Sequence, residues 1–151
     1  MPIDFQDCLV RYSNHGIQFD YPDIWAIEEQ AADGDVLITV SGSETCFWTV
    51  RIMSSCPPPP QVVESCVTAF EEEYEDAEVE QIEGKLAEMP AVARHVTFFC
   101  MDLMNAANLR SVRTSEFTLL VWWQGTHHEL AENQPILDHL THSLRSQQLL
   151  D

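Results

Sequence analysis

The sequence predicts an α+β fold: an α/β/α sandwich with a mostly antiparallel central sheet and two main helices. Three observations support this class. Most of the chain alternates between β-forming stretches and short turn signals, which is typical of hairpins and not of βαβ units. Two stretches instead repeat apolar residues every three or four positions, the period of a helix with one buried face. One such helix on each face would cover a single sheet.

The first fifty residues are expected to form a series of strands joined by tight turns. Ile17, Phe19 and Tyr21 alternate with polar residues, which is the period of a half-buried strand. The turn before them contains Gly16, which can adopt a positive φ at little cost. Further strands are predicted over residues 24–30, 36–40 and 47–53, with turns at residues 33–34 and 41–44.

The first helix is predicted directly after the four prolines Pro57–Pro60. Proline cannot join the interior of a sheet, but it suits the first turn of a helix. Apolar residues then recur at helical spacing from Val62 to Tyr74. A polyproline segment can also be a ligand for an aromatic groove, but directly before a helix we interpret it as a stiff connector.

The second half predicts more strands and the second helix. Strand signals return between residues 79 and 86, continue over 91–104, and end in the apolar run 117–123. The segment Asn105–Asn108 is interpreted as a turn between two of these strands. The last helix is expected to have its cap near Asn133, with Pro135 in its first turn and an apolar stripe through Leu140.

Length and composition indicate one acidic domain covering residues 1–151. The apolar fraction of 45% is enough for a core. The 25 acidic residues against 7 basic ones give a formal net charge of −18, which would repel nucleic acid and anionic membranes. With no visible leader and no membrane-spanning segment, we expect a soluble, cytoplasmic, bacterial-type protein. The five cysteines show no disulfide or zinc spacing, so we expect reduced thiols.

The sequence contains no recognisable catalytic motif. There is no Gly-x-Ser-x-Gly elbow and no glycine-rich phosphate loop, and we expect no cofactor. Histidines with nearby acids are the best local candidates for a metal site, because imidazole and carboxylate are common ligands. They form two groups, each more simply interpreted as a solvated face: His127, His128 and Glu132, and His139 with His142.

Two features are candidate partner-binding surfaces. An acidic run at the end of the first helix places seven carboxylates between Glu71 and Glu80, and it could dock a basic protein. A solvated helix end is the simpler interpretation. Trp122 is the second candidate, because adjacent tryptophans on a strand point to opposite faces and one of them could line a groove. The residues considered for partner binding are Glu71, Glu72, Glu73, Glu75, Asp76 and Trp122.

Both ends of the chain resemble PsbP-like domains. The first carries Gly16-x-x-Phe19-x-Tyr21-Pro22-x-x-Trp25, and the second carries Ser143-Leu144-Arg145, similar to the family's terminal Ser-apolar-Arg. The family includes a photosystem II extrinsic subunit, a Ran-binding import factor and bacterial adaptor-chaperones of type VI secretion. The resemblance implies an α/β/α sandwich. It does not imply photosynthesis, because no residues match a photosystem-binding motif.

The leading functional hypothesis is therefore a non-enzymatic binding or adaptor module whose partner is another protein. Its sharper form is a secretion adaptor or chaperone that holds an apolar segment of a client in a groove of the sheet. The alternative is a small metal-dependent or hydrolytic enzyme that uses the His127–Glu132 region. A third hypothesis is a structural subunit that associates through a sheet edge or a tryptophan-bearing face.

Overall fold

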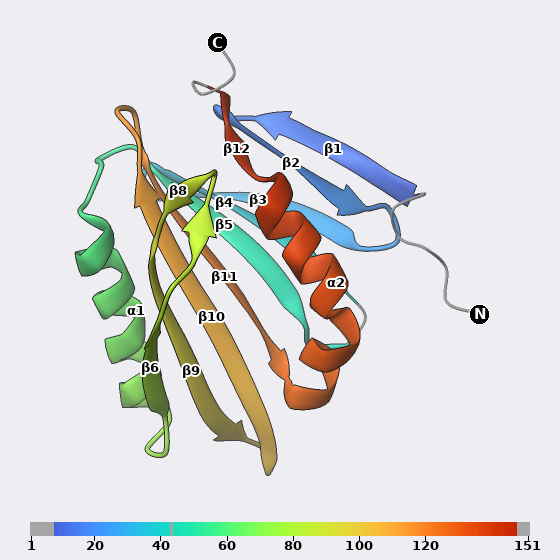
Figure 1. Cartoon of the computed structure of the whole chain (residues 1–151), viewed down its shortest axis with the longest axis vertical. Helices are drawn as coiled ribbons and strands as arrows, with labels where there is room; N and C mark the ends of the chain where they lie inside the picture. The colour runs from blue at the N-terminus through green and yellow to red at the C-terminus, as the bar shows by residue number, and fades with distance from the viewer. Residues whose placement is uncertain (1–7, 43, 148–151) are drawn as a thin grey trace.

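The computed structural model describes residues 8–42 and 44–147, and a seven-stranded sheet forms its centre (Figure 1). The strand order is β3-β4-β5-β11-β10-β9-β6, and every neighbouring pair is antiparallel. The strands are β3 (Ala26–Ala32), β4 (Asp35–Ser41), β5 (Phe47–Met53), β6 (Glu78–Ile82), β9 (Val92–Cys100), β10 (Leu103–Arg113) and β11 (Thr118–Thr126). This is the mostly antiparallel sheet that the sequence predicts.

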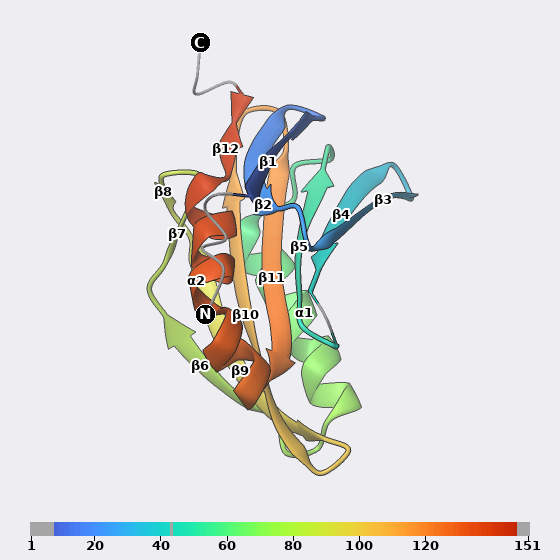
Figure 2. The ribbon, with the colours of Figure 1, turned by 90° about the vertical axis from the view of Figure 1, so that its right-hand side faces the viewer.

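Two helices cover opposite faces of this sheet, as the alternation of side chains in β11 explains (Figure 2). Helix α1 (Pro59–Glu73) packs against β9, β10 and β11, and helix α2 (His127–Ser143) packs against β2, β10 and β11. Leu120 lies in the core on the α1 side, whereas Leu119 and Val121 lie in the larger core that contains Leu137 of α2. Because successive strand residues point to opposite faces, one apolar run supplies both cores.

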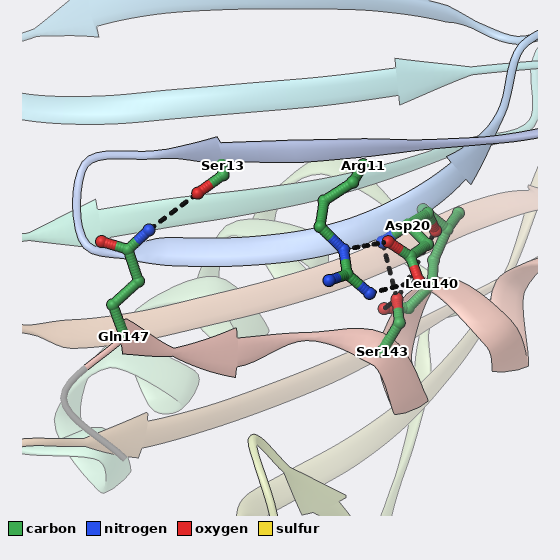
Figure 3. A network of polar contacts seen from close by, with 6 residues as sticks. All are labelled: Arg11, Ser13, Asp20, Leu140, Ser143 and Gln147. Carbon is green, nitrogen blue, oxygen red and sulfur yellow. Dashed lines mark hydrogen bonds and ion pairs between the residues drawn. The ribbon is translucent and has the colours of Figure 1, made fainter. Parts of the chain in front are cut away.

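A smaller sheet joins the two ends of the described chain. Its strands β1 (Leu9–Asn14), β2 (Ile17–Pro22) and β12 (Arg145–Ser146) lie in the order β1-β2-β12. Figure 3 shows the polar contacts that attach β2 to the end of α2. The Ser143 hydroxyl accepts a hydrogen bond from the Asp20 N–H at 2.9 Å and lies 3.1 Å from the Leu140 carbonyl oxygen. The terminal Ser-Leu-Arg motif thus has a structural role here, and Leu144 is fully buried.

Local patterns predict several elements correctly. Strands β2, β4 and β5 and helix α1 begin or end within one or two residues of the expected positions, and Pro59 and Pro60 occupy the first turn of α1. Gly16 has the positive φ, 85°, that its turn requires. The short hairpin of β7 (Lys85–Leu86) and β8 (Met89–Pro90) falls within a region expected to be extended.

Three details of the prediction are wrong. The residues Asn105–Asn108 do not form a turn but lie inside β10, because Ala106 and Ala107 are buried in the sheet. Helix α2 begins at His127 and not near Asn133, because Thr126 and Glu129 form a capping box there, and Pro135 lies inside the helix. Strands β1 and β12 were not predicted, because their sequences show no clear apolar alternation.

Within the described residues, none of the helices is both long enough and apolar enough to cross a bilayer.

Candidate functional site

Four of the six exposed large apolar side chains among the described residues lie at the end of the β9–β10 hairpin. The exposed fraction is 52% for Phe99, 90% for Met101, 56% for Leu103 and 46% for Met104. The other large apolar side chains described as exposed are Val10 and Ile24, on separate elements. We call residues Phe99–Met104 the hairpin end. It presents exposed apolar side chains on both faces of the hairpin, where a folded domain usually places polar residues.

The hairpin end is a continuation of the sheet and not a loose loop. Cys100 is paired with Leu103, so only Met101 and Asp102 form the turn. Both have positive φ angles, 53° and 65°, which suits the twist of a two-residue hairpin although neither residue is glycine. Paired strands therefore fix the backbone of Phe99, Cys100, Leu103 and Met104 on either side of the turn.

Apolar side chains project from both faces of this hairpin end. Phe99 is paired with Met104, so these two side chains share one face of the sheet. Leu103 and Cys100 share the other face, on the side of α1. On that side, the Tyr74 ring stacks on Phe98 with 4.3 Å between ring centroids, which anchors the base of the hairpin end.

The acidic run predicted from sequence borders the hairpin end. The Asp76 carboxylate accepts a hydrogen bond of 3.2 Å from the Phe99 N–H. The side chains of Glu71–Glu73, Glu75 and Asp76 are exposed, and α1 ends toward the same end of the molecule as the β9–β10 turn (Figures 1 and 2). We call residues Glu71–Asp76 and the hairpin end together the acidic apolar end. An apolar centre with carboxylates at its rim is suited to bind a cationic, apolar partner.

Trp122 lies in the middle of the sheet and not at the acidic apolar end. It is half-buried, packs with both cores on the α1 side, and meets Phe47 edge-on with 6.1 Å between ring centroids. Trp123 is only 5% exposed and lies on the opposite face. A shallow groove of about 220 Å³ also lies beside α1, between Arg51, Val62 and Leu120. This groove is a second place on the α1 side that could accept an apolar segment.

The histidines of the predicted metal groups lie on α2. His127 and His128 are exposed, and His128 Nε2 lies 3.1 Å from the Glu132 carboxylate. His142 is exposed at the other end of the helix, and His139 is half-buried. Across residues 8–42 and 44–147, the structure places no three histidine, cysteine, aspartate or glutamate side chains where they could share a metal ion.

Glu129, within the same segment, has a structural role that the sequence reasoning missed. Its side chain is 4% exposed and accepts hydrogen bonds from the Thr45 N–H at 2.8 Å, the Cys46 N–H at 3.0 Å and the Thr126 N–H at 2.9 Å. Burial alone would raise the pKa of Glu129, but the hydrogen bonds from Thr45 and Thr126 lower it to about 2. The signal was present as Thr126-x-x-Glu129, the spacing of a capping box.

Two of the cysteines, Cys46 and Cys66, have thiols that their surroundings keep protonated. All five are free thiols. Burial, with a smaller contribution from the Glu129 charge, raises the pKa of Cys46 to about 12, and burial also raises the pKa of Cys66. A thiol that reacts as a nucleophile needs the opposite shift, because the thiolate is the reactive form.

Comparisons with known proteins identify the fold. No family model and no curated protein matches the chain. Among solved structures it is similar to CyanoP, the cyanobacterial PsbP of Synechocystis sp. PCC 6803, with 15% identity, a TM-score of 0.58 and 92% of each chain covered. It is similar to LpqN, involved in cell envelope biogenesis of Mycobacterium tuberculosis, with 9% identity, a TM-score of 0.51 and 93% of each chain covered.

A third similar structure is PA94, a protein of unknown function from Pseudomonas aeruginosa. Its identity is 13% and its TM-score 0.49, over 85% of this chain and 90% of that one. The chain therefore has a PsbP-like fold, which confirms the fold expected from the sequence resemblance.

Proposed function

We propose that this chain is a non-enzymatic binding or adaptor module and that the acidic apolar end is its partner surface. The observation that carries the proposal is the exposure of Phe99, Met101, Leu103 and Met104 on one hairpin end. Single exposed apolar residues are ordinary, but a contiguous patch with a polar rim is typical of a protein-interaction site. Methionine adapts its shape to different partners, which suits an adaptor.

The charge at this end selects the chemistry of the partner. Five carboxylates between Glu71 and Asp76 lie beside the apolar side chains, in a chain of net charge −18. A partner that buried apolar side chains against Met101 would place its flanking residues near these acids. Lysine or arginine would be favoured there and acids would be repelled. The proposed occupant is therefore a cationic, amphipathic segment of another protein.

Three observations support a binding role over catalysis. The described histidines and acids form no three-ligand metal group. In the His127–Glu132 region, the carboxylate of Glu129 is already occupied by structural hydrogen bonds. It accepts from the Thr126 N–H at the helix cap and from the Thr45 N–H in the β4–β5 loop. The buried thiols of Cys46 and Cys66 are kept protonated. The resemblance to PsbP-like domains favours a secretion adaptor or chaperone as the finer form of this proposal.

Fluorescence anisotropy with labelled peptides tests the proposal. A helical peptide of leucine and lysine is expected to bind, whereas a peptide with glutamate in place of lysine and one with serine in place of leucine are not. The double substitution Met101→Ser with Leu103→Ser removes apolar contact area and is expected to weaken binding about tenfold. Ile24→Ser, at an exposed apolar residue between β2 and β3, is the matched control and should leave the affinity unchanged.

The outcomes distinguish specific binding at the acidic apolar end from general electrostatic attraction to an acidic protein. Equal binding of the lysine–leucine and lysine–serine peptides would show that only net charge matters, which would overturn the proposal. An equal loss on Ile24→Ser would also overturn it. Binding to phosphatidylcholine vesicles without binding to any peptide would instead identify the hairpin end as a membrane contact.

A further inference from the structure

A cleft of about 540 Å³ lies between the β7–β8 hairpin, strand β10 and the C-terminal turn of α2. This volume is within the range of sites for small molecules. The residues with ionisable side chains that line it are Lys85, Glu88, Arg110, His142 and Arg145. We call it the basic cleft. Figure 1 shows β8 and the end of α2 near one end of the sheet, away from the turn of the β9–β10 hairpin.

The cleft concentrates the scarce positive charge of the chain. Of only seven basic residues against 25 acidic ones, three line this cleft, and Lys85 is the only lysine. Glu88 is the only carboxylate in the lining. A random distribution of acids over the surface would surround three clustered cations with several carboxylates. The composition of the cleft is therefore opposite to that of the rest of the molecule, which favours an anionic ligand.

Arg110 is held rigidly at the floor of the cleft. Its Nε donates to the Asn108 side-chain oxygen at 3.1 Å, and one terminal nitrogen donates to the Lys85 carbonyl at 3.0 Å. The guanidinium lies 5.1 Å from the centroid of the Trp123 ring. A Cβ on Gly84 would lie 3.0 Å from the guanidinium, so only glycine leaves room for this approach. The side chain is thus half-buried with its direction fixed.

Among the described residues, Lys85 and Arg110 have no ion-pair partner at contact distance, although the charge of Asp138 on α2 also acts on Arg110. Arg145 does pair with Glu88, at 3.2 Å, although 68% of the Glu88 side chain is exposed. Arg145 also donates to the carbonyls of His142 and Leu144. Those bonds offset the negative end of the α2 dipole, which would otherwise repel an anion here.

The hairpin that forms one wall of the cleft has a strained turn. Ala87 and Glu88 have positive φ angles of 51° and 67°, a conformation that costs L-residues about 1–2 kcal/mol each in general. Leu86 and Ala87 are nonetheless almost fully buried, which holds the turn in place.

We propose that the basic cleft binds a small organic anion through a carboxylate or phosphate group, with Arg110 and Lys85 as the contacting cations. The terminal nitrogens of Arg110 keep N–H donors that Asn108 and Lys85 do not use, and these can donate to an oxygen of either group. Lys85 adds a mobile point charge at the rim. The aliphatic parts of the Lys85 and Arg110 side chains can contact the apolar part of the ligand. This site goes beyond the proposed partner surface and does not depend on it.

Calorimetric titration of the whole chain with benzoate and phenyl phosphate tests this site, with benzamide as the neutral analogue and inorganic phosphate as the anion without an apolar part. At least one of the two aromatic anions is expected to bind saturably, and the one that binds more tightly identifies the preferred group. Benzamide should not bind. Lys85→Gln and Arg110→Gln should each weaken the affinity about fivefold or more.

Arg113→Gln is the matched control, because Arg113 is an exposed arginine on the same strand and its loss changes the net charge equally. It should change the affinity less than twofold. Lys85→Gln alters an exposed side chain, so this test holds even where Arg110→Gln lowers stability. Saturable binding of neither anion, equal binding of benzamide, or equal losses on Lys85→Gln and Arg113→Gln would overturn the proposal.

Discussion

Two hairpins of this molecule turn through the same backbone conformation and end in opposite surroundings. In β7–β8 the turn residues are Ala87 and Glu88, and in β9–β10 they are Met101 and Asp102, all with positive φ angles. Ala87 is 1% exposed, whereas Met101 is 90% exposed. The first turn faces a cleft lined by cations, and the second lies beside a run of acids.

The difference shows that the exposure of a turn depends on whether a packed core lies beside it. The β7–β8 hairpin folds over the α2 face, where Leu86 joins the main core beside β10. The β9–β10 hairpin extends until neither core covers the side chains of Phe99 and Met104. The same kind of turn therefore forms part of a buried wall in the β7–β8 hairpin and part of an exposed apolar surface in the β9–β10 hairpin.

The largest expected effect compares one leucine from each hairpin. Leu86→Ala empties a site that is 1% exposed and should lower the free energy of unfolding by about 3 kcal/mol. Leu103→Ala, at 56% exposure, should change it by less than about 0.5 kcal/mol. Urea unfolding followed by circular dichroism measures both. Similar losses in the two variants would mean that the hairpin end is packed and not available to a partner.

The acids beside the hairpin end differ from the acid that the fold itself uses. Glu129→Ala breaks buried hydrogen bonds to Thr45, Cys46 and Thr126 and should cost about 2–3 kcal/mol. Glu72→Ala should cost nothing and stabilise α1 slightly, because an acid near a helix C-terminus opposes the dipole. Thermal unfolding at neutral pH measures the contrast.

The same glutamate gives a pH dependence with a definite sign. The pKa of Glu129 is about 2 in the folded chain and near 4.5 when it is unperturbed. Its stabilising contribution is complete above about pH 4.5 and is lost as the pH falls toward 2, because the unfolded chain takes up the proton first. Unfolding curves between pH 6 and pH 2 should show a smaller loss in Glu129→Ala than in the original chain. Parallel losses would contradict this assignment.

A smaller effect is expected from the one carboxylate of the basic cleft. Glu88→Gln removes the acid that pairs with Arg145 and should tighten anion binding about threefold. Asp102→Asn, the matching change in the turn of the other hairpin, should leave it unchanged. Titration with benzoate measures both. Weaker binding in Glu88→Gln would show that Glu88 positions Arg145 more than it repels the ligand.

The smallest effect concerns the strain shared by the two turns. Asp102→Gly relieves a left-handed residue with an exposed side chain and should stabilise the chain by about 0.5 kcal/mol. Glu88→Gly should stabilise the chain by a smaller amount, because it also removes the ion pair to Arg145. Unfolding midpoints in urea compare them. Destabilisation by Asp102→Gly would mean that its carboxylate contributes to the turn.

The position of the β9–β10 turn shows where local sequence patterns fail. Asn105-Ala106-Ala107-Asn108 has the composition of a turn, yet it lies inside β10, and Ala107 is buried beneath α1. Small residues there allow the helix to approach the sheet, so packing decides the structure against local propensity. Because this composition predicts the turn four residues too late, Met101 is assigned to a strand and the exposed end of the hairpin is not predicted.

Other parts of the molecule follow from local signals alone. The prolines before α1 and the alternation in β2 fix their elements because the causes lie within a few residues. The acidic run was visible as a composition feature, but its contact with Phe99 depends on the packing of α1 and on strand register. The basic cleft was not predicted at all. Lys85, Arg110 and Arg145 are far apart in the sequence, and only the folded sheet brings them together.

Strand β12 has a consequence for the order in which the chain folds. It pairs Arg145 with Gln18, and Ser143 is bonded to Asp20 across 123 positions of sequence. Closing so long a loop is slow compared with forming the hairpins of the large sheet. On a ribosome, this edge of β2 therefore stays unpaired until Arg145 and Ser146 have emerged. An open strand edge can pair with another chain, so we expect this molecule to be most prone to aggregation during synthesis.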